Sequence, residues 1–197
     1  MRPTGLINGL LCKKGVTTLS VLNQLVLFAE YNKLMNQRLF SAAAKLSDED
    51  LKKDCNAFFK SVFGTLNHIL VGDIVWLKRF SEHPSSQVSL SYIAGLEKPQ
   101  SLSSNLFADL DSLGIERKRI DEILIQWING LSETDINDCI SYKNMAGKPF
   151  KKQYSSLINH LFLHQVHHRG QVTTLISQFS IDFGETDIIE IIDECIA

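Results

Sequence analysis

Residues 155–179 read SSLINHLFLHQVHHRGQVTTLISQF, and four of the six histidines of the chain fall in this stretch. We predict a long helix here, and on a helical wheel one narrow face carries polar groups over about three turns: His160, His164, His167, His168 and Gln171. Leu157 and Leu175 bracket that face. A polar stripe closed by leucines at both ends suits an interior position, so we expect these side chains to point into the protein.

Two of these histidines have the spacing of a metal-binding pair. His164 and His168 are four residues apart, so their rings lie side by side on neighbouring turns and can share one ion at about 2.0–2.1 Å. Two ligands rarely suffice, and His68 is the candidate third ligand. Gly64 and Gly72 lie one turn away on each side of it. Glycines inside a helix usually permit a close approach, and here they are expected to leave room for an ion and its ligand.

Each of these signals also has an ordinary explanation. A lone helical histidine such as His68 is most often a surface residue or one that is hydrogen-bonded inside the protein. A histidine pair with a spacing of four occurs often by chance. The combination of the pair, the polar stripe and the glycine-flanked third histidine favours a divalent metal site.

Three further stretches are predicted to form long amphipathic helices: residues 19–46, 57–80 and 105–131, the last with Gly114 as an interruption. Residues 84–105 are rich in Ser, Gly and Pro and are expected to form a loop. A strand at 138–142 and a turn at 144–149 allow a small hairpin, and residues 187–195 can form a short last helix. The predicted fold class is therefore all-α, a four-helix bundle with a small hairpin before the last long helix.

Polar residues occur on the apolar faces of two of these helices. Asn32 lies on the apolar arc of the first helix and Asn36 on its border, so both amides are expected to be hydrogen-bonded inside the bundle. Arg117 lies on the apolar stripe of the third helix. We expect it either to extend its charge toward water or to pair inside the bundle.

Composition limits the class of protein. The chain has 197 residues, 44% of them hydrophobic, which suits one domain, expected over residues 21–197. A formal net charge of −2 disfavours nucleic-acid binding, and no apolar run approaches the roughly 18 residues of a membrane span. The four cysteines are scattered, which suits a reducing, cytoplasmic location. Residues 1–20 contain no acidic residue and are expected to form a loosely ordered extension.

Several blocks of the sequence resemble the DinB (damage-inducible, YfiT-like) superfamily. The run from His160 to Gln171, with its HHRGQ segment, is similar to the signature helix of that family. Further blocks are similar to other parts of it: 31–36, 58–68, 73–80 and 184–187. The resemblance extends from about Val21 to Asp187. It implies a four-helix bundle, a homodimer, and a divalent metal site whose ligands carry over to His68, His164 and His168.

The resemblance also implies a range of functions. Some relatives are metal-dependent thiol S-transferases or isomerases that use a low-molecular-weight thiol, and many have no known activity. We therefore expect either a metal-dependent thiol transferase or hydrolase-like enzyme, or a metal-binding stress-response protein without turnover. An open coordination position would favour the enzyme, whereas a fourth protein ligand or a sealed cavity would favour the second.

The identity of the metal and the surroundings of the site are also expectations. Zinc or nickel suits three imidazole ligands. Seven further side chains are expected to support the ligands or contact substrate: Asn32, Asn36, Arg79, His160, His167, Arg169 and Gln171. Arg79 and Arg169 are expected either to hold an anionic substrate or to form surface salt bridges. No cysteine is placed as a nucleophile, so any reacting thiol is expected to come from a separate cosubstrate.

Overall fold

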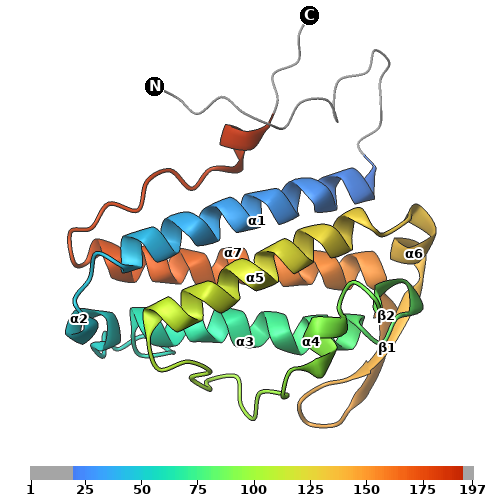
Figure 1. Ribbon diagram of the computed structural model, residues 1–197, viewed down its shortest axis with the longest axis horizontal. Coiled ribbons are helices and arrows are strands. Elements are labelled where there is room, and N and C mark those ends of the chain that lie inside the picture. Colours follow the sequence, from blue (N-terminus) through green and yellow to red (C-terminus); the bar gives the residue numbers. More distant parts are fainter. Residues whose placement is uncertain (1–19, 193–197) are drawn as a thin grey trace, which may run out of the picture.

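The computed structural model describes residues 20–192. Four long helices run along the long axis of the molecule (Figure 1): α1 Val21–Ala43, α3 Val62–Phe80, α5 Leu110–Asn129 and α7 Tyr154–Ser177. The predicted all-α four-helix bundle is thereby confirmed. The predicted N-terminal extension falls on residues 1–19, which lie outside the described part of the chain, and on Ser20.

The second long helix begins five residues later than predicted. A short helix, α2 Asp48–Lys52, is followed by a tight turn in which Asn56 and Lys60 adopt left-handed backbone angles, with φ of 55° and 68°. Such angles interrupt a right-handed helix. The hydroxyl of Ser61 then accepts a hydrogen bond from the backbone of Gly64 at 3.0 Å and caps α3. The sequence between 57 and 61 has helical composition, but its backbone forms this turn.

A long connection, residues 81–109, determines the topology of the bundle. It leaves the end of α3 and returns along the bundle to the start of α5, so these two helices run in the same direction (Figure 1). The predicted loop in this region contains two short helices, η1 Pro84–Ser86 and α4 Ser91–Gly95. α1 packs against α5 and α7, while α3 packs mainly against α7.

The third long helix begins at Leu110 rather than near 105, because Asp109 caps it by accepting from the backbone of Ser112 at 2.7 Å. Gly114 lies inside this helix and does not interrupt it. The segment before the cap is held differently: the side-chain oxygen of Asn67 on α3 accepts a hydrogen bond from the backbone of Leu106 at 2.9 Å. The end of the long connection is thus fixed to α3.

The small hairpin is confirmed. After a short helix, α6 Glu133–Asn137, the strands β1 Cys139–Lys143 and β2 Pro149–Gln153 pair antiparallel, with Ser141 opposite Lys151. The predicted final helix is replaced by a 3-10 turn, η2 Ile188–Ile191, and residues 193–197 lie outside the described range.

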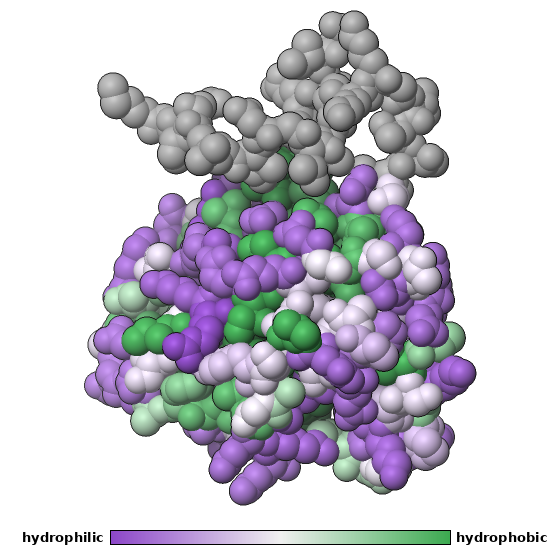
Figure 2. Space-filling model, turned by 45° about the vertical axis from the view of Figure 1, so that its right-hand side comes forward, coloured by the Kyte–Doolittle hydropathy of each residue, from purple (hydrophilic) through white to green (hydrophobic). Residues whose placement is uncertain are grey.

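Aromatic residues close the core at the hairpin end of the bundle. Phe80 stacks on Trp127, with ring centroids 5.4 Å apart. The buried hydroxyl of Ser86 accepts from the Trp127 indole at 2.8 Å and lies 2.8 Å from the Tyr154 hydroxyl, so the polar atoms of both rings are satisfied. On the face seen in Figure 2, hydrophobic groups lie among hydrophilic side chains. No helix in residues 20–192 combines the length and apolar character that a membrane crossing requires.

Candidate metal centre

His68 on α3 meets His164 and His168 on α7. One nitrogen of each ring lies within 4.8 Å of a nitrogen of both others. Nε2 of His68 is 3.0 Å from Nε2 of His168, although the residues are 100 positions apart. Two imidazole nitrogens that bind one ion in a tetrahedral arrangement are about 3.3 Å apart, so this spacing suits shared ligation. The structure therefore brings together all three predicted ligands.

Hydrogen bonds on the far side of two rings determine which nitrogen faces the cluster. Nδ1 of His68 lies 2.7 Å from the carbonyl oxygen of Leu102, and since a carbonyl only accepts, Nδ1 carries the proton. Nδ1 of His168 lies 2.8 Å from the side-chain oxygen of Gln171 and donates to it in the same way. In the neutral rings both Nε2 atoms therefore carry lone pairs that point toward each other.

Burial keeps all three rings neutral. Desolvation lowers the pKa of His68, that of His168 and, most strongly, that of His164, to about 3. The neighbouring histidines add to this effect because each protonated ring would repel the others. A neutral imidazole is the form that binds metal, so no proton has to be removed at neutral pH.

The His164 ring packs directly against Gly72. A Cβ atom at position 72 would lie 2.6 Å from Cε1 and 3.1 Å from Nδ1 of that ring. Gly72 thus does permit a close approach, but the group that approaches is the His164 imidazole. The prediction that Gly72 leaves room for an ion and its ligand is therefore wrong, because the ring fills that space. Nδ1 of His164 is buried without a hydrogen-bond partner among the described residues.

Gly64 serves a different purpose. A Cβ atom there would lie 2.1 Å from the carbonyl oxygen of Phe59, so Gly64 accommodates the turn before α3 and not an ion. The sequence reasoning did not identify Phe59 itself. Its ring stacks on His68 with a centroid separation of 3.7 Å and meets His168 edge-on at 5.6 Å. Phe59 also lines a hollow of about 420 Å³ together with His167 and Gln171.

Two further histidines flank the cluster, but both are exposed. The His160 ring lies 6.1 Å from that of His164 and 5.0 Å from Trp76, and His167 packs edge-on against His168 at 4.8 Å. The expectation that the whole polar stripe points inward is therefore wrong for these two. They lie beside the ligands, at the edge of the bundle.

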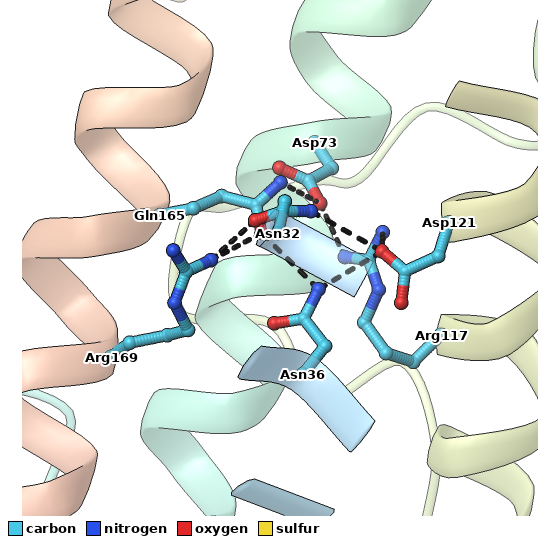
Figure 3. Close-up of polar contacts among 7 residues, drawn as sticks. All are labelled: Asn32, Asn36, Asp73, Arg117, Asp121, Gln165 and Arg169. Atoms are coloured by element: carbon cyan, nitrogen blue, oxygen red, sulfur yellow. Dashed lines mark hydrogen bonds and ion pairs between the residues drawn. The ribbon is translucent and has the colours of Figure 1, made fainter. Parts of the chain in front are cut away.

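Behind the cluster, seven polar side chains from all four long helices form a buried network (Figure 3), here called the interior network: Asn32, Asn36, Asp73, Arg117, Asp121, Gln165 and Arg169. Nδ2 of Asn36 donates to Asp121 at 2.9 Å, and Asn32 donates to the same oxygen at 3.3 Å. The predicted interior hydrogen bonds of both asparagines are confirmed. Their partners belong to the network, and neither contact involves a metal ligand.

Two arginines and two aspartates balance the charge of the interior network. Arg117 donates to Asp73, and its Nη2 lies 2.9 Å from Asp121 Oδ1, so of the two predicted alternatives Arg117 pairs inside. Burial raises the pKa of Asp73 to about 6, although the Arg117 charge opposes this shift. Arg169 is buried and donates a hydrogen bond to Asn32. The alternative prediction for Arg169, a surface salt bridge, is therefore wrong.

Gln165 of the interior network follows His164 in the sequence, so the two residues are joined through the backbone of α7. Its amide nitrogen donates to Asp73 Oδ2 at 2.9 Å, and its oxygen accepts from Arg169 at 3.3 Å. Sequence reasoning missed Gln165, Asp73 and Asp121. The one available signal was the spacing of four between Arg117 and Asp121, which places opposite charges on neighbouring turns.

Arg79 is not part of the cluster or of the interior network. It lies seven residues beyond Gly72, about two turns further along α3. Its guanidinium group packs over the rings of Trp76 and Tyr142, 4.4 and 5.0 Å from their centroids. Arg79 thus packs on aromatic rings and not on the three ligand histidines, and its expected contact with substrate stays a prediction.

The three clustered histidines, His68, His164 and His168, fit a divalent ion. Two lone pairs that face each other at 3.0 Å repel in the neutral rings, and a cation between them would remove this repulsion. The unpartnered Nδ1 of His164 shows that this ring is not held by hydrogen bonds to the described residues. Three imidazoles suit zinc or nickel better than calcium or magnesium, which prefer oxygen ligands.

Comparisons with known proteins identify the family of the chain and one relative. The sequence matches the DinB family over residues 18–188. It is 24% identical over 158 residues to the protein called Protein DinB from Bacillus subtilis (strain 168), and this alignment covers 80% of the present chain and 87% of that protein. No solved structure matches the chain.

Proposed function

The chain belongs to the DinB family, and from this premise we propose that it holds one divalent ion, zinc or nickel, through His68, His164 and His168, and that the ion serves an enzymatic reaction. One observation carries the proposal: Nε2 of His68 and Nε2 of His168 lie 3.0 Å apart with their lone pairs facing each other. A hydrogen bond on the other side of each ring turns its Nε2 toward the cluster.

The number of ligands favours catalysis over a purely structural role. Within residues 20–192, the cluster contains three histidines and no cysteine or carboxylate as a fourth ligand. Structural zinc sites usually have four protein ligands, whereas catalytic sites have three and admit an outer ligand. This is the feature that distinguishes the enzyme from the metal-binding stress-response protein without turnover.

A divalent ion at this place would supply a Lewis acid that makes a bound thiol or water nucleophilic near neutral pH. The protein's own residues hold the site ready. Leu102 and Gln171 fix the orientation of two ligand rings, and the Phe59 ring stacks on the His68 ring. Because the rings are neutral, they present lone pairs without first losing a proton.

We propose a thiol S-transferase as the reaction class, with a hydrolase-like reaction as the alternative. Of the cysteines in the described part of the chain, Cys139 is exposed on the hairpin and Cys55 lies in the turn before α3, and neither joins the histidine cluster. We therefore propose that the nucleophilic sulfur comes from a separate low-molecular-weight thiol.

The test is metal content followed by turnover. Untagged protein, reconstituted with zinc or nickel and dialysed, should retain about one ion per chain, and His68→Ala with His164→Ala should retain none. The loaded protein is then assayed with small thiols and an electrophile. If the wild type holds no more metal than the double variant, the site does not exist. If it holds metal but consumes no thiol or ester, the non-enzymatic alternative stands.

A further inference from the structure

A second pocket lies where the hairpin meets the end of α3. It has a volume of about 700 Å³. It lies between the last turns of α3 with Glu82 just beyond them, Lys98 in the long connection, and both strands of the hairpin. It shares no lining residue with the histidine cluster. Among the lining residues, Glu82 is the single anion. Five lining residues are cations: Lys78, Arg79, Lys98, Lys143 and Lys151. We call this feature the cationic pocket.

One of these cations has a structural task. Nζ of Lys78 donates to the carbonyl oxygens of Ile93 and Ala94, at 3.2 and 2.8 Å, and so holds the end of α4. The four others form no ion pair with any carboxylate in residues 20–192. The cationic pocket therefore carries an excess of positive charge that the described residues do not neutralise.

Arg79 is the most constrained of the four. Its guanidinium group is packed over two aromatic rings, of Trp76 and Tyr142, and the side chain is half-buried. Burial lowers its pKa, which means that the charge has lost part of its hydration. Among the described residues, no side-chain hydrogen bond uses its five N–H donors. The planar donor group is thus held in place and has no acceptor within residues 20–192.

We propose that the cationic pocket binds a small oxyanion with two or more negative charges, carried by phosphate or carboxylate groups, with Arg79 as its anchor. Arginine offers paired N–H donors that match the oxygens of such groups, and a desolvated arginine gains more from this pairing than one in water. Lys98, Lys143 and Lys151 surround the pocket and favour a multiply charged ligand over a monoanion. This site is independent of the proposed metal site.

The hairpin supplies matched controls. Strand pairing sets Lys151 opposite Ser141 and Lys152 opposite Ile140. Lys148 lies in the turn. Lys148 and Lys152 have Nζ atoms 5.5 Å from the centroid of the Phe150 ring, and neither lines the cationic pocket. Removing Lys143 and Lys151, or Lys148 and Lys152, deletes the same charge from the same hairpin.

The experiment measures binding of pyrophosphate and, separately, of citrate by calorimetry, on full-length protein with and without metal. We expect binding in both metal states. Arg79→Met should weaken it by about tenfold or more, Arg79→Lys by less, and the Lys143→Ala, Lys151→Ala pair by about tenfold. The Lys148→Ala, Lys152→Ala pair should change the affinity by less than about twofold. Arg119→Met is a second control and should also change the affinity by less than about twofold. The Arg119 guanidinium stacks on Tyr92 outside the pocket, 4.9 Å from the ring centroid.

The two ligands distinguish phosphate from carboxylate recognition. Melting temperatures of all variants identify any that fail to fold, and Arg79→Lys retains the charge if Arg79→Met does not fold. Equal losses in the two lysine pairs would show long-range attraction only and overturn the proposal, as would absence of binding to both ligands. Tighter binding of a single-stranded oligonucleotide that depends on Lys148 and Lys152 would also overturn it and indicate a nucleic-acid surface. Binding that required metal would place the ligand at the histidines instead.

Discussion

Nε2 of His68 and Nε2 of His168 face each other at 3.0 Å from two different helices, and each ring is oriented by an oxygen on its opposite side. The orienting oxygen of His68 is a backbone carbonyl, which no substitution removes. That of His168 belongs to the Gln171 side chain and can be removed. The site therefore offers one clean test of how far orientation matters.

Replacing Gln171 with methionine should weaken metal binding by about 10- to 100-fold, because His168 loses the acceptor that fixes its tautomer. Methionine has nearly the same length, so the free energy of unfolding of the metal-free protein should change little. Affinity is measured by competition with a chelator. Gln37→Met, on the exposed surface of α1, is the control. Equal affinities for the Gln171 variant and the wild type would contradict the assigned tautomer.

Stability should depend on pH through the three ligand rings. Their pKa values in the folded chain lie below the usual 6.5, with His164 at about 3. Below about pH 6.5 the unfolded chain therefore binds protons that the folded chain excludes, and the free energy of unfolding contributed by these rings falls as pH falls toward 3. The gain in melting temperature on adding zinc should also shrink from pH 8 to pH 5. A metal-induced gain that is the same at both pH values would argue against histidine ligation.

Alanine at Gly72 should weaken metal binding by about tenfold or more, because the new methyl group would displace the His164 ring. Gly170→Ala, in α7 with open space around the new Cβ atom, is the control and should stabilise the protein by up to about 1 kcal/mol without changing metal affinity. Gly64→Ala should destabilise the fold, because its Cβ atom meets a backbone oxygen. Metal affinity that is unchanged in Gly72→Ala would show that the His164 position does not matter.

Removing the Arg117 charge should destabilise the protein by about 3–5 kcal/mol, because Asp73 and Asp121 would remain buried without it. Arg117→Met keeps most of the volume, so the loss reports charge more than packing. Arg38→Met, which breaks a partly exposed ion pair with Glu190, should cost no more than about 1 kcal/mol. Urea unfolding measures both. Similar losses in the two variants would mean that the interior network does not hold the bundle together.

We also propose that the chain forms a two-fold dimer, as the family resemblance implies. Large apolar side chains remain exposed on α7, where Leu163 is 64% and Val166 44% accessible. Light scattering should give a mass of about twice 22.2 kDa at micromolar concentrations. Leu163→Glu should shift the mass toward the monomer, whereas Ile115→Glu, at an exposed site on α5, should not. A wild-type mass of one chain throughout that range would exclude the dimer.

The sequence was sufficient to predict the four long helices and the three histidines, because both leave periodic patterns. Helical spacing identifies His164 and His168 directly. Helix ends were less predictable: the turn at Asn56 and Lys60 replaces a stretch of helical composition, since backbone geometry at two residues decides it. The caps at Ser61 and Asp109 then set where α3 and α5 begin.

The partners of buried polar residues could not be predicted. Asp121 lies 85 positions from Asn36 in the sequence, and Gln165 lies 92 from Asp73, so these contacts depend on how the helices pack. The role of Gly72 was misjudged for the same reason. Sequence showed that something must come close to it, and only the packing of α3 on α7 shows that this is the His164 ring.

The separation of 100 positions between His68 and His168 gives an ion between them the effect of a crosslink. It would tie α3 to the last long helix, α7, and close a loop that includes the long connection, the hairpin and the whole of α5. For covalent bridges, closing a loop of this size lowers the entropy of the unfolded chain by the equivalent of about 4–5 kcal/mol. Removing the ion with a chelator would therefore lower the free energy of unfolding of the whole bundle. A chain lacking α7 would lose His164 and His168 and could not retain the ion.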